Sequence, residues 1–290
     1  MSISKTITFS APDGLLITGT RYGSDGSPPV LLLHGAGQTR HSWGGTASRL
    51  AAAGWCAISV DTRGHGDSQW APDGDYSIDS LLTDLTLIVE EIQQNWSVRP
   101  AVVGASLGGI TALIAEGECG DGLFNSLVLV DITPSLNRAG VERILEFMRR
   151  YSDGFATLDD ARRAVSGFQP HRKSGKSQSV SSGLEKNLRY KDGRYYWHWD
   201  PRLLDHVSDL DTQLVARQQR ACRSLDLPVL LVHGRMSDVV SNDSAREFLQ
   251  LVPGAQYVNV ADAAHMVAGD DNDVFSTSVS EFLRTSQHNE

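Results

Sequence analysis

The sequence predicts an α/β protein built on a mostly parallel sheet that carries helices on both faces. Short, fully apolar runs such as VLLLH (30–34) are typical of strands buried on both sides. Segments with helical spacing separate these runs, as in 78–95, where apolar residues recur every three or four positions. Strands that alternate with helices in this way form parallel pairs, with the helices packed against the sheet.

The expected elements follow in order along the chain. Residues 6–10 and 15–22 form an antiparallel hairpin around the Asp13-Gly14 turn. Further strands are expected at 30–34, 55–60, 101–103, 127–130, 229–233 and 257–260. Helices are expected at 43–53, 78–95, 107–116, 244–252 and 274–284.

Residues 137–223 interrupt this alternation, because they lack short apolar runs and are mostly helical in pattern. We therefore expect a helical lid at 134–223, inserted into a core made of 1–133 and 224–290. The 137–223 segment holds 17 Lys and Arg against 11 Asp and Glu, whereas the rest of the chain is acidic. The basic charge has two readings: it guides an anionic substrate, or it belongs to solvated helix faces that attract the core.

Composition excludes several classes of protein. A net charge of −9 argues against a general role on nucleic acid or on an anionic membrane. Three widely separated cysteines form no disulfide framework and favour a reducing compartment. We expect a cytoplasmic protein, since no signal-peptide core or membrane-length apolar run is present, and the sequence predicts no oligomeric state.

The stretch AVVGASLGGITALIAEG (101–117) carries the first chemical signal, because a strand pattern runs through Gly-x-Ser-x-Gly directly into a helix pattern. A sharp strand-to-helix turn lifts one side chain clear of the sheet, and small residues on either side relieve the crowding. Ser106 occupies the lifted position between Gly104 and Gly108. The sequence therefore predicts that Ser106 is a nucleophile at the positive end of a helix.

A nucleophilic serine requires a histidine base that a carboxylate holds in place. In this architecture the expected order is serine, acid, histidine, each on a loop that follows a strand. Asp238 and His265 satisfy that order and are the predicted acid and base. Asp131, at the end of an earlier strand, is the rival acid, and Asp262 is expected to stabilise the histidine loop.

Acyl transfer also requires backbone N–H groups for the developing oxyanion. One is expected from Leu107, the residue after the nucleophile. The other is expected from Ala36 in the HGAG loop (34–37), where glycines allow close backbone approach.

Together, Ser106, Asp238, His265, the HGAG loop and DTRGHGDS (61–68) resemble the α/β-hydrolase superfamily. The resemblance covers about 1–133 and 224–290, and it implies an eight-stranded sheet with a lid inserted after the sixth strand. In that family the Asp-x-Arg-Gly-x-Gly-x-Ser loop is chiefly structural. Dehalogenases and epoxide hydrolases of this fold carry aspartate at the elbow, so Ser106 argues against both activities and for acyl chemistry.

We therefore expect a serine hydrolase that cleaves a small to medium carboxylic ester or lactone through an acyl-enzyme. The alternatives are a carbon–carbon bond hydrolase acting on an anionic diketone or dienoate, and a slow-turnover small-molecule receptor. No metal site is expected, because HExxH and paired cysteines are both lacking. No cofactor is expected either, since Arg40 stands where a dinucleotide-binding glycine motif would need glycine.

Four aromatic residues are candidates for the substrate pocket. Tyr196, Trp197 and Trp199 lie in the densest aromatic stretch of the expected lid, and Trp43 follows the HGAG loop. The alternative for the lid residues is that they pack the lid onto the core.

Overall fold

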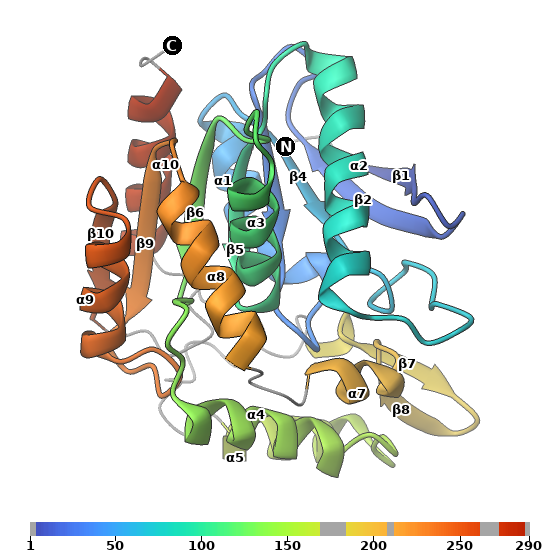
Figure 1. Cartoon of the computed structure of the whole chain (residues 1–290). Coiled ribbons are helices and arrows are strands. Elements are labelled where there is room, and N and C mark those ends of the chain that lie inside the picture. The colour runs from blue at the N-terminus through green and yellow to red at the C-terminus, as the bar shows by residue number, and fades with distance from the viewer. Residues whose placement is uncertain (1–3, 169–183, 208–211, 262–272, 288–290) are drawn as a thin grey trace.

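An eight-stranded sheet forms the centre of the computed structural model, which describes residues 4–168, 184–207, 212–261 and 273–287 (Figure 1). Its spatial order is β1-β2-β4-β3-β5-β6-β9-β10. The strands are β1 (Ser4–Ser10), β2 (Leu16–Tyr22), β3 (Pro29–Leu33), β4 (Cys56–Val60), β5 (Ala101–Ala105), β6 (Ser126–Val130), β9 (Val229–Gly234) and β10 (Gln256–Val260). The β1–β2 and β2–β4 pairs are antiparallel and the others are parallel, which confirms the predicted sheet.

Helices cover both faces of this sheet, as expected (Figure 1). One face carries α1 (Gly44–Ala52) and α10 (Asp273–Ser286); the other carries α2 (Ile78–Trp96), α3 (Leu107–Glu118), α8 (Thr212–Ser224) and α9 (Asn242–Leu251). Strand side chains alternate between the two layers: Leu31 of β3 packs with the α2–α3 side, and its neighbour Leu32 with the α1–α10 side. In the described part of the chain, no helix is both long enough and apolar enough to span a bilayer.

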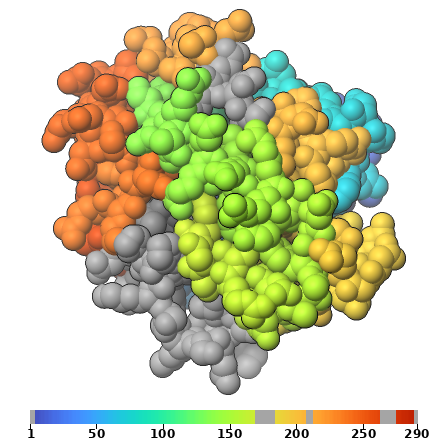
Figure 2. All heavy atoms as spheres, turned by 90° about the horizontal axis from the view of Figure 1, so that it is seen from below, coloured from blue at the N-terminus to red at the C-terminus, as the bar shows by residue number. Residues whose placement is uncertain are grey.

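The segment between β6 and β9 crosses the carboxyl ends of the parallel strands (Figures 1 and 2). It contains α4 (Arg138–Arg150), α5 (Leu158–Phe168), β7 (Leu188–Lys191), β8 (Arg194–Trp197), a 3-10 turn η2 (Pro201–Leu203) and α7 (Leu204–Val207). The sequence predicted a helical lid and no strands within it, but residues 188–197 form an antiparallel hairpin of β7 and β8. Asp192 and Gly193 make its turn with positive φ of 50° and 81°, so the Asp-Gly pair was the missed signal.

Helix α8 also differs from the expected lid boundary at residue 223. It packs along α3 of the core so closely that a Cβ on Gly117 would overlap the backbone of Ala221. Within this stretch of mostly helical pattern, the described residues after β8 form η2 and α7 before residue 208 and α8 from Thr212.

A buried network fixes residues 198–202 to the core. The N–H of Gly66 donates to the His198 carbonyl at 2.7 Å, and the N–H of Asp200 donates to the Gly64 carbonyl at 2.8 Å. The Tyr76 hydroxyl donates to the buried Asp200 carboxylate at 2.6 Å. This end of the β6–β9 segment is therefore held by hydrogen bonds that are shielded from water.

Candidate active site

Ser106 lies at the turn between β5 and α3, where the sequence predicted a nucleophile. Its backbone has φ of +48° and ψ of −120°, a conformation that is strained for a residue with a Cβ. The N–H of Ser106 lies 3.4 Å from the Val130 carbonyl of the neighbouring strand β6. The side chain is half-buried, so the hydroxyl sits at the sheet edge rather than in the core.

The glycines around Ser106 allow three backbone segments to meet. A Cβ on Gly104 would lie 2.7 Å from the Cα of Gly109, and a Cβ on Gly108 would lie 2.7 Å from the carbonyl oxygen of His34. Real Cβ atoms do not approach so closely, and larger residues would therefore push β5, α3 and the HGAG loop apart. This is the physical reason for Gly-x-Ser-x-Gly at this turn.

The HGAG loop passes directly beside Ser106, since a Cβ on Gly35 would lie 3.0 Å from the Cβ of Ser106. Among the described residues, no protein group accepts a hydrogen bond from the N–H of Ala36 or of Leu107. Both predicted oxyanion donors thus have N–H groups with no partner in the described part of the chain, and they lie on the two segments that flank Ser106.

Two buried histidines brace the HGAG loop. His34 Nδ1 donates to the Gly35 carbonyl at 2.8 Å, while its Nε2 accepts from the Thr62 N–H at 3.1 Å. His65 Nε2 accepts from the Gly37 N–H at 3.1 Å. Burial lowers the pKa of His34 to about 4 and that of His65 to about 3, so both imidazoles are neutral near pH 7.

This histidine pair predicts a loss of stability in mild acid. Below a pH of about 6.5 the unfolded chain binds protons at both positions while the folded chain does not. Above about pH 6.5 the free energy of unfolding has its full value. As the pH falls below about 6.5, each histidine lowers this free energy by about 1.4 kcal/mol per pH unit, until the pH approaches the pKa of that histidine in the folded protein. Urea unfolding from pH 7.5 to 4.5 measures this slope.

The matched control for this slope is His65→Gln, whose side-chain oxygen still accepts from the Gly37 N–H but does not titrate. Its stability should fall less steeply with pH than that of the wild type. Equal slopes in the two proteins would show that carboxylates, and not the histidine pair, control acid unfolding.

The DTRGHGDS loop forms buried ion pairs. Asp61 accepts from the Arg40 backbone N–H at 2.6 Å and also from its guanidinium, and Arg63 donates twice to Asp84 at 2.6 Å each. These pairs hold the loop that carries His65, which agrees with a structural role for the motif.

The two candidate acids occupy very different environments. Asp131 follows β6, is fully buried and has a positive φ of 52°; its carboxylate accepts from the Gly234 N–H at 3.0 Å and from the Ser237 hydroxyl at 2.5 Å. The Asp238 side chain is 40% exposed, and its Oδ2 accepts from Arg143 Nε at 2.7 Å and also from Nη2. Asp131, unlike Asp238, directly follows a strand that pairs with β5.

The remaining predicted residues fall into separate places. His265 and Asp262 lie outside the described residues. The Trp43 side chain is fully buried between the sheet and α10, with its ring 6.3 Å from Phe275, so core packing accounts for it. The structure thus places Trp43 in the core layer and gives it no contact with Ser106.

The aromatic residues of the β7–β8 region divide between two environments. Trp197 lies in a small cluster with Phe155, at a ring distance of 5.3 Å, and Tyr196 is adjacent to Gly154. Trp199 instead reaches the HGAG loop, since its Nε1 would lie 3.7 Å from a Cβ on Gly37.

The sequence did not single out Met148 of α4, yet its Cε would lie 3.0 Å from the same Cβ on Gly37. Met148 and the indole N–H edge of Trp199 therefore both lie against the HGAG loop at Gly37. No local pattern marks Met148, because the contact joins residues far apart in the chain.

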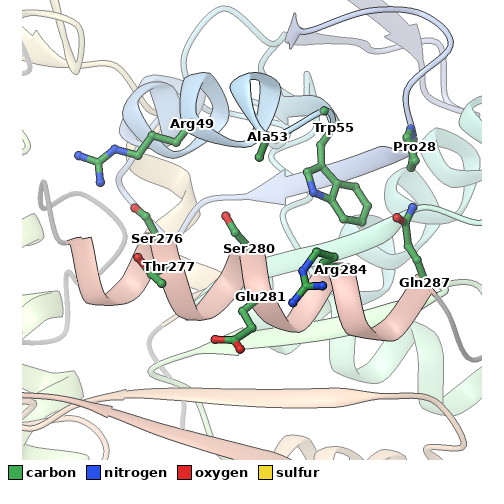
Figure 3. Close-up of a pocket in the computed structure, with 11 residues that line it drawn as sticks. Pro28, Arg49, Ala53, Trp55, Ser276, Thr277, Ser280, Glu281, Arg284 and Gln287 are labelled. Carbon is green, nitrogen blue, oxygen red and sulfur yellow. The ribbon is translucent and has the colours of Figure 1, made fainter.

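A pocket of about 680 Å³ lies between α1 and α10 (Figure 3). Pro28 and Trp55, which line it, come directly before β3 and β4. The pocket is therefore at the amino ends of the parallel strands, whereas Ser106 follows the carboxyl end of β5. It is separate from the candidate active site.

Within the described ranges, no group of three His, Cys, Asp or Glu side chains is arranged to hold a metal ion.

A nucleophile elbow on a mostly parallel sheet of this kind defines the class of α/β hydrolases. The chain belongs to the alpha/beta hydrolase fold family, whose model matches residues 28–271. It is 30% identical over 267 residues to the esterase Rv0045c of Mycobacterium tuberculosis, covering 88% of this chain and 82% of that protein. A crystal structure of that esterase has a TM-score of 0.75 and 26% identity, and covers 98% of this chain and 92% of that one.

Two further proteins show the range of the family. The sn-1-specific diacylglycerol lipase ABHD11 of Danio rerio is 26% identical over 90% of this chain and 80% of its own length. An alpha/beta hydrolase from Novosphingobium aromaticivorans has a TM-score of 0.83 with 23% identity, covering 98% of this chain and 99% of that one, and shares the fold. Of these similar proteins, one is named as an esterase and one as a lipase.

Proposed function

We propose that this protein is a serine hydrolase that cleaves a small to medium carboxylic ester or lactone through an acyl-enzyme. The observation that carries the proposal is the strained backbone of Ser106, beside the HGAG loop and at the N-terminus of α3. Strain of this kind persists only where the surrounding structure holds it, and it is concentrated at active sites. The similarity to named esterases supports the same reaction class.

The proposed reaction has two halves. His265 removes the proton from the Ser106 hydroxyl, whose oxygen attacks the ester carbonyl, and the N–H groups of Ala36 and Leu107 donate to the oxyanion. The intermediate collapses to an acyl-enzyme, and His265 returns the proton to the departing alkoxide. Water, deprotonated by His265, then attacks the acyl group and releases the carboxylic acid and Ser106.

The carboxylate that orients His265 is the part of the triad on which sequence and geometry differ. The sequence predicted Asp238, although Asp131 also lies between Ser106 and His265 in the chain. Geometry favours Asp131, because a triad acid is usually buried, and Asp131 is buried, strained and next to the strand that leads to Ser106. We assign the acid to Asp131 and keep Asp238 as the alternative that the same mutants test.

The surroundings of the oxyanion loop favour a partly apolar substrate. The Met148 thioether lies against the loop at Gly37 beside the indole of Trp199, and uncharged surfaces of this kind bind acyl chains better than charged ones. Tyr196 and Trp197 remain candidates for the acyl pocket further from the loop.

A matched panel of substrates tests this proposal. The panel contains p-nitrophenyl esters of rising acyl length and several lactones, assayed with wild type and with Ser106→Ala. We expect multiple turnovers by the wild type on at least one short or medium ester, and none by the variant. Turnover that survives in Ser106→Ala would contradict the proposal. A wild-type rate that does not exceed the rate of the variant on any ester or lactone would also contradict it.

One observation favours a second candidate, the carbon–carbon bond hydrolase. A pocket of about 380 Å³ between α4 and α5 is lined by three arginines, Arg143, Arg150 and Arg163. An anionic diketone in the panel tests this activity. Saturable binding of a panel member with almost no turnover would instead favour the slow-turnover receptor.

A further inference from the structure

The geometry points to a clamp between Arg143 and Asp238 that sets how closely α4 covers the nucleophile and so limits the length of the acyl group. The inference deepens the proposed esterase function and rests on it. Arg143 projects from α4, and its Nε and Nη2 both donate to Oδ2 of Asp238, on the loop after β9. The two residues are 95 positions apart in the chain.

The same guanidinium also binds the end of α5. Its Nη1 donates to the Phe168 carbonyl at 3.1 Å, and its central carbon lies 4.5 Å from the centre of the Phe168 ring. The Phe168 ring in turn stacks on Phe147 of α4 at 4.3 Å. Arg143 therefore connects α4, α5 and the loop after β9. Of these three, only the loop that carries Asp238 belongs to the core.

The first turn of α4 is fitted to the Asp238 loop. The Asn137 N–H donates to the Val239 carbonyl at 2.8 Å, and the Asn137 side chain caps the helix. Gly140 faces Asp238 so closely that a Cβ at this position would overlap the Asp238 carbonyl oxygen. Helix α4 and the loop therefore have one docked position, which the ion pair holds from the solvent side.

The opposite end of α4 lies over the catalytic machinery, where Met148 contacts the oxyanion loop at Gly37. A helix held at Asp238 and resting on Gly37 spans the region above Ser106. When the clamp opens, Met148 can move away from Gly37 and leave room for a longer acyl chain.

The clamp is suited to opening because both side chains are partly in water, 47% exposed for Arg143 and 40% for Asp238. Exposed ion pairs contribute little to global stability and weaken with salt. By contrast, the network at Asp200 that holds the other end of the segment is buried. Breaking the clamp should therefore free α4 without unfolding the protein.

The first test measures kcat/KM for p-nitrophenyl butyrate and decanoate in Arg143→Gln. We expect the decanoate-to-butyrate ratio to rise by about fivefold to tenfold, the size of coupling usual between contacting residues. The matched control is Arg149→Gln, which removes the same charge from α4 at a residue with no ion pair to Asp238 in the described structure. An equal change at both acyl lengths, or the same rise in the control, would overturn the inference.

The second test uses hydrogen exchange and does not depend on activity. Exchange of the α4 amides should accelerate about equally in Arg143→Gln, in Asp238→Asn and in the double variant, because each of the three variants removes the same contact between Arg143 and Asp238. The β7–β8 hairpin should be unaffected. Unchanged α4 exchange would refute the clamp, and so would a double variant in which the effects of the two single substitutions add. Either result counts even if no ester is ever hydrolysed. Accelerated α4 exchange together with a failed substrate panel would refute only the proposed function.

Discussion

Replacing Ser106 with alanine is expected to abolish covalent labelling by a fluorophosphonate and to reduce ester hydrolysis by about 10⁶-fold, to the background rate. Removal of the hydroxyl leaves the elbow without a nucleophile, while the alanine Cβ fits the same space. The fold should persist, because the hydroxyl makes no hydrogen bond in the described structure. Labelling is measured by intact-protein mass, alongside circular dichroism as the folding control.

Retained labelling in a folded Ser106→Ala protein would place the nucleophile at another residue. Loss of labelling together with loss of fold would be uninformative, so Ser106→Cys serves as the second variant. Cysteine keeps the elbow geometry and supplies a thiol, which should react with an alkylating agent faster than buried Cys56 or Cys222.

The second large effect is expected at Asp131. Asp131→Asn should lower kcat/KM by about 10⁴-fold, because an amide in place of the carboxylate favours the wrong histidine tautomer and cannot stabilise the imidazolium. Asp238→Asn should cost far less on a short ester. The measurement is the pH profile of kcat/KM for both variants. Loss of the carboxylate should also lower the pKa of the histidine base, which limits activity on the acid side of the profile.

Asp131 also anchors the loop after β9, and the control must separate this role from an electrostatic one. Ser237→Ala removes the hydroxyl that donates to Asp131 and accepts from the N–H groups of Val239 and Val240, but it leaves the carboxylate in place. If Asp131 only holds the loop, Ser237→Ala and Asp131→Asn should be similarly impaired. A 10⁴-fold loss in Asp238→Asn instead would show that the acid is Asp238, as the sequence predicted.

Local sequence predicted the elbow and the sheet because their signals are local. Ser106 needs only the glycines within two residues of it, and a strand such as β3 is recognisable because every residue in it is apolar and buried. The β7–β8 hairpin had a local signal too, in Asp192-Gly193, but the surrounding helical patterns obscured it.

Contacts between distant residues were not predictable in this way. Nothing near Arg143 indicates that it binds a carboxylate 95 positions away, and nothing near Met148 indicates that it covers the oxyanion loop. Trp43 illustrates the converse: its place after the HGAG loop suggested a pocket wall, but the helical turn there points the indole into the core. Spacing tells which strand end a residue follows, but packing between elements determines which way its side chain faces.

The backbone of Ser106 has one more consequence, for the relation between reactivity and folding. Its φ of +48° is held by β6 on one side and by the HGAG loop on the other, and these segments come together only when the whole sheet has assembled. A partly assembled chain has no reason to keep a strained serine, which would relax into an ordinary conformation. Rapid labelling at Ser106 therefore counts native molecules, and its recovery after dilution from denaturant follows the formation of the complete sheet rather than of any single helix.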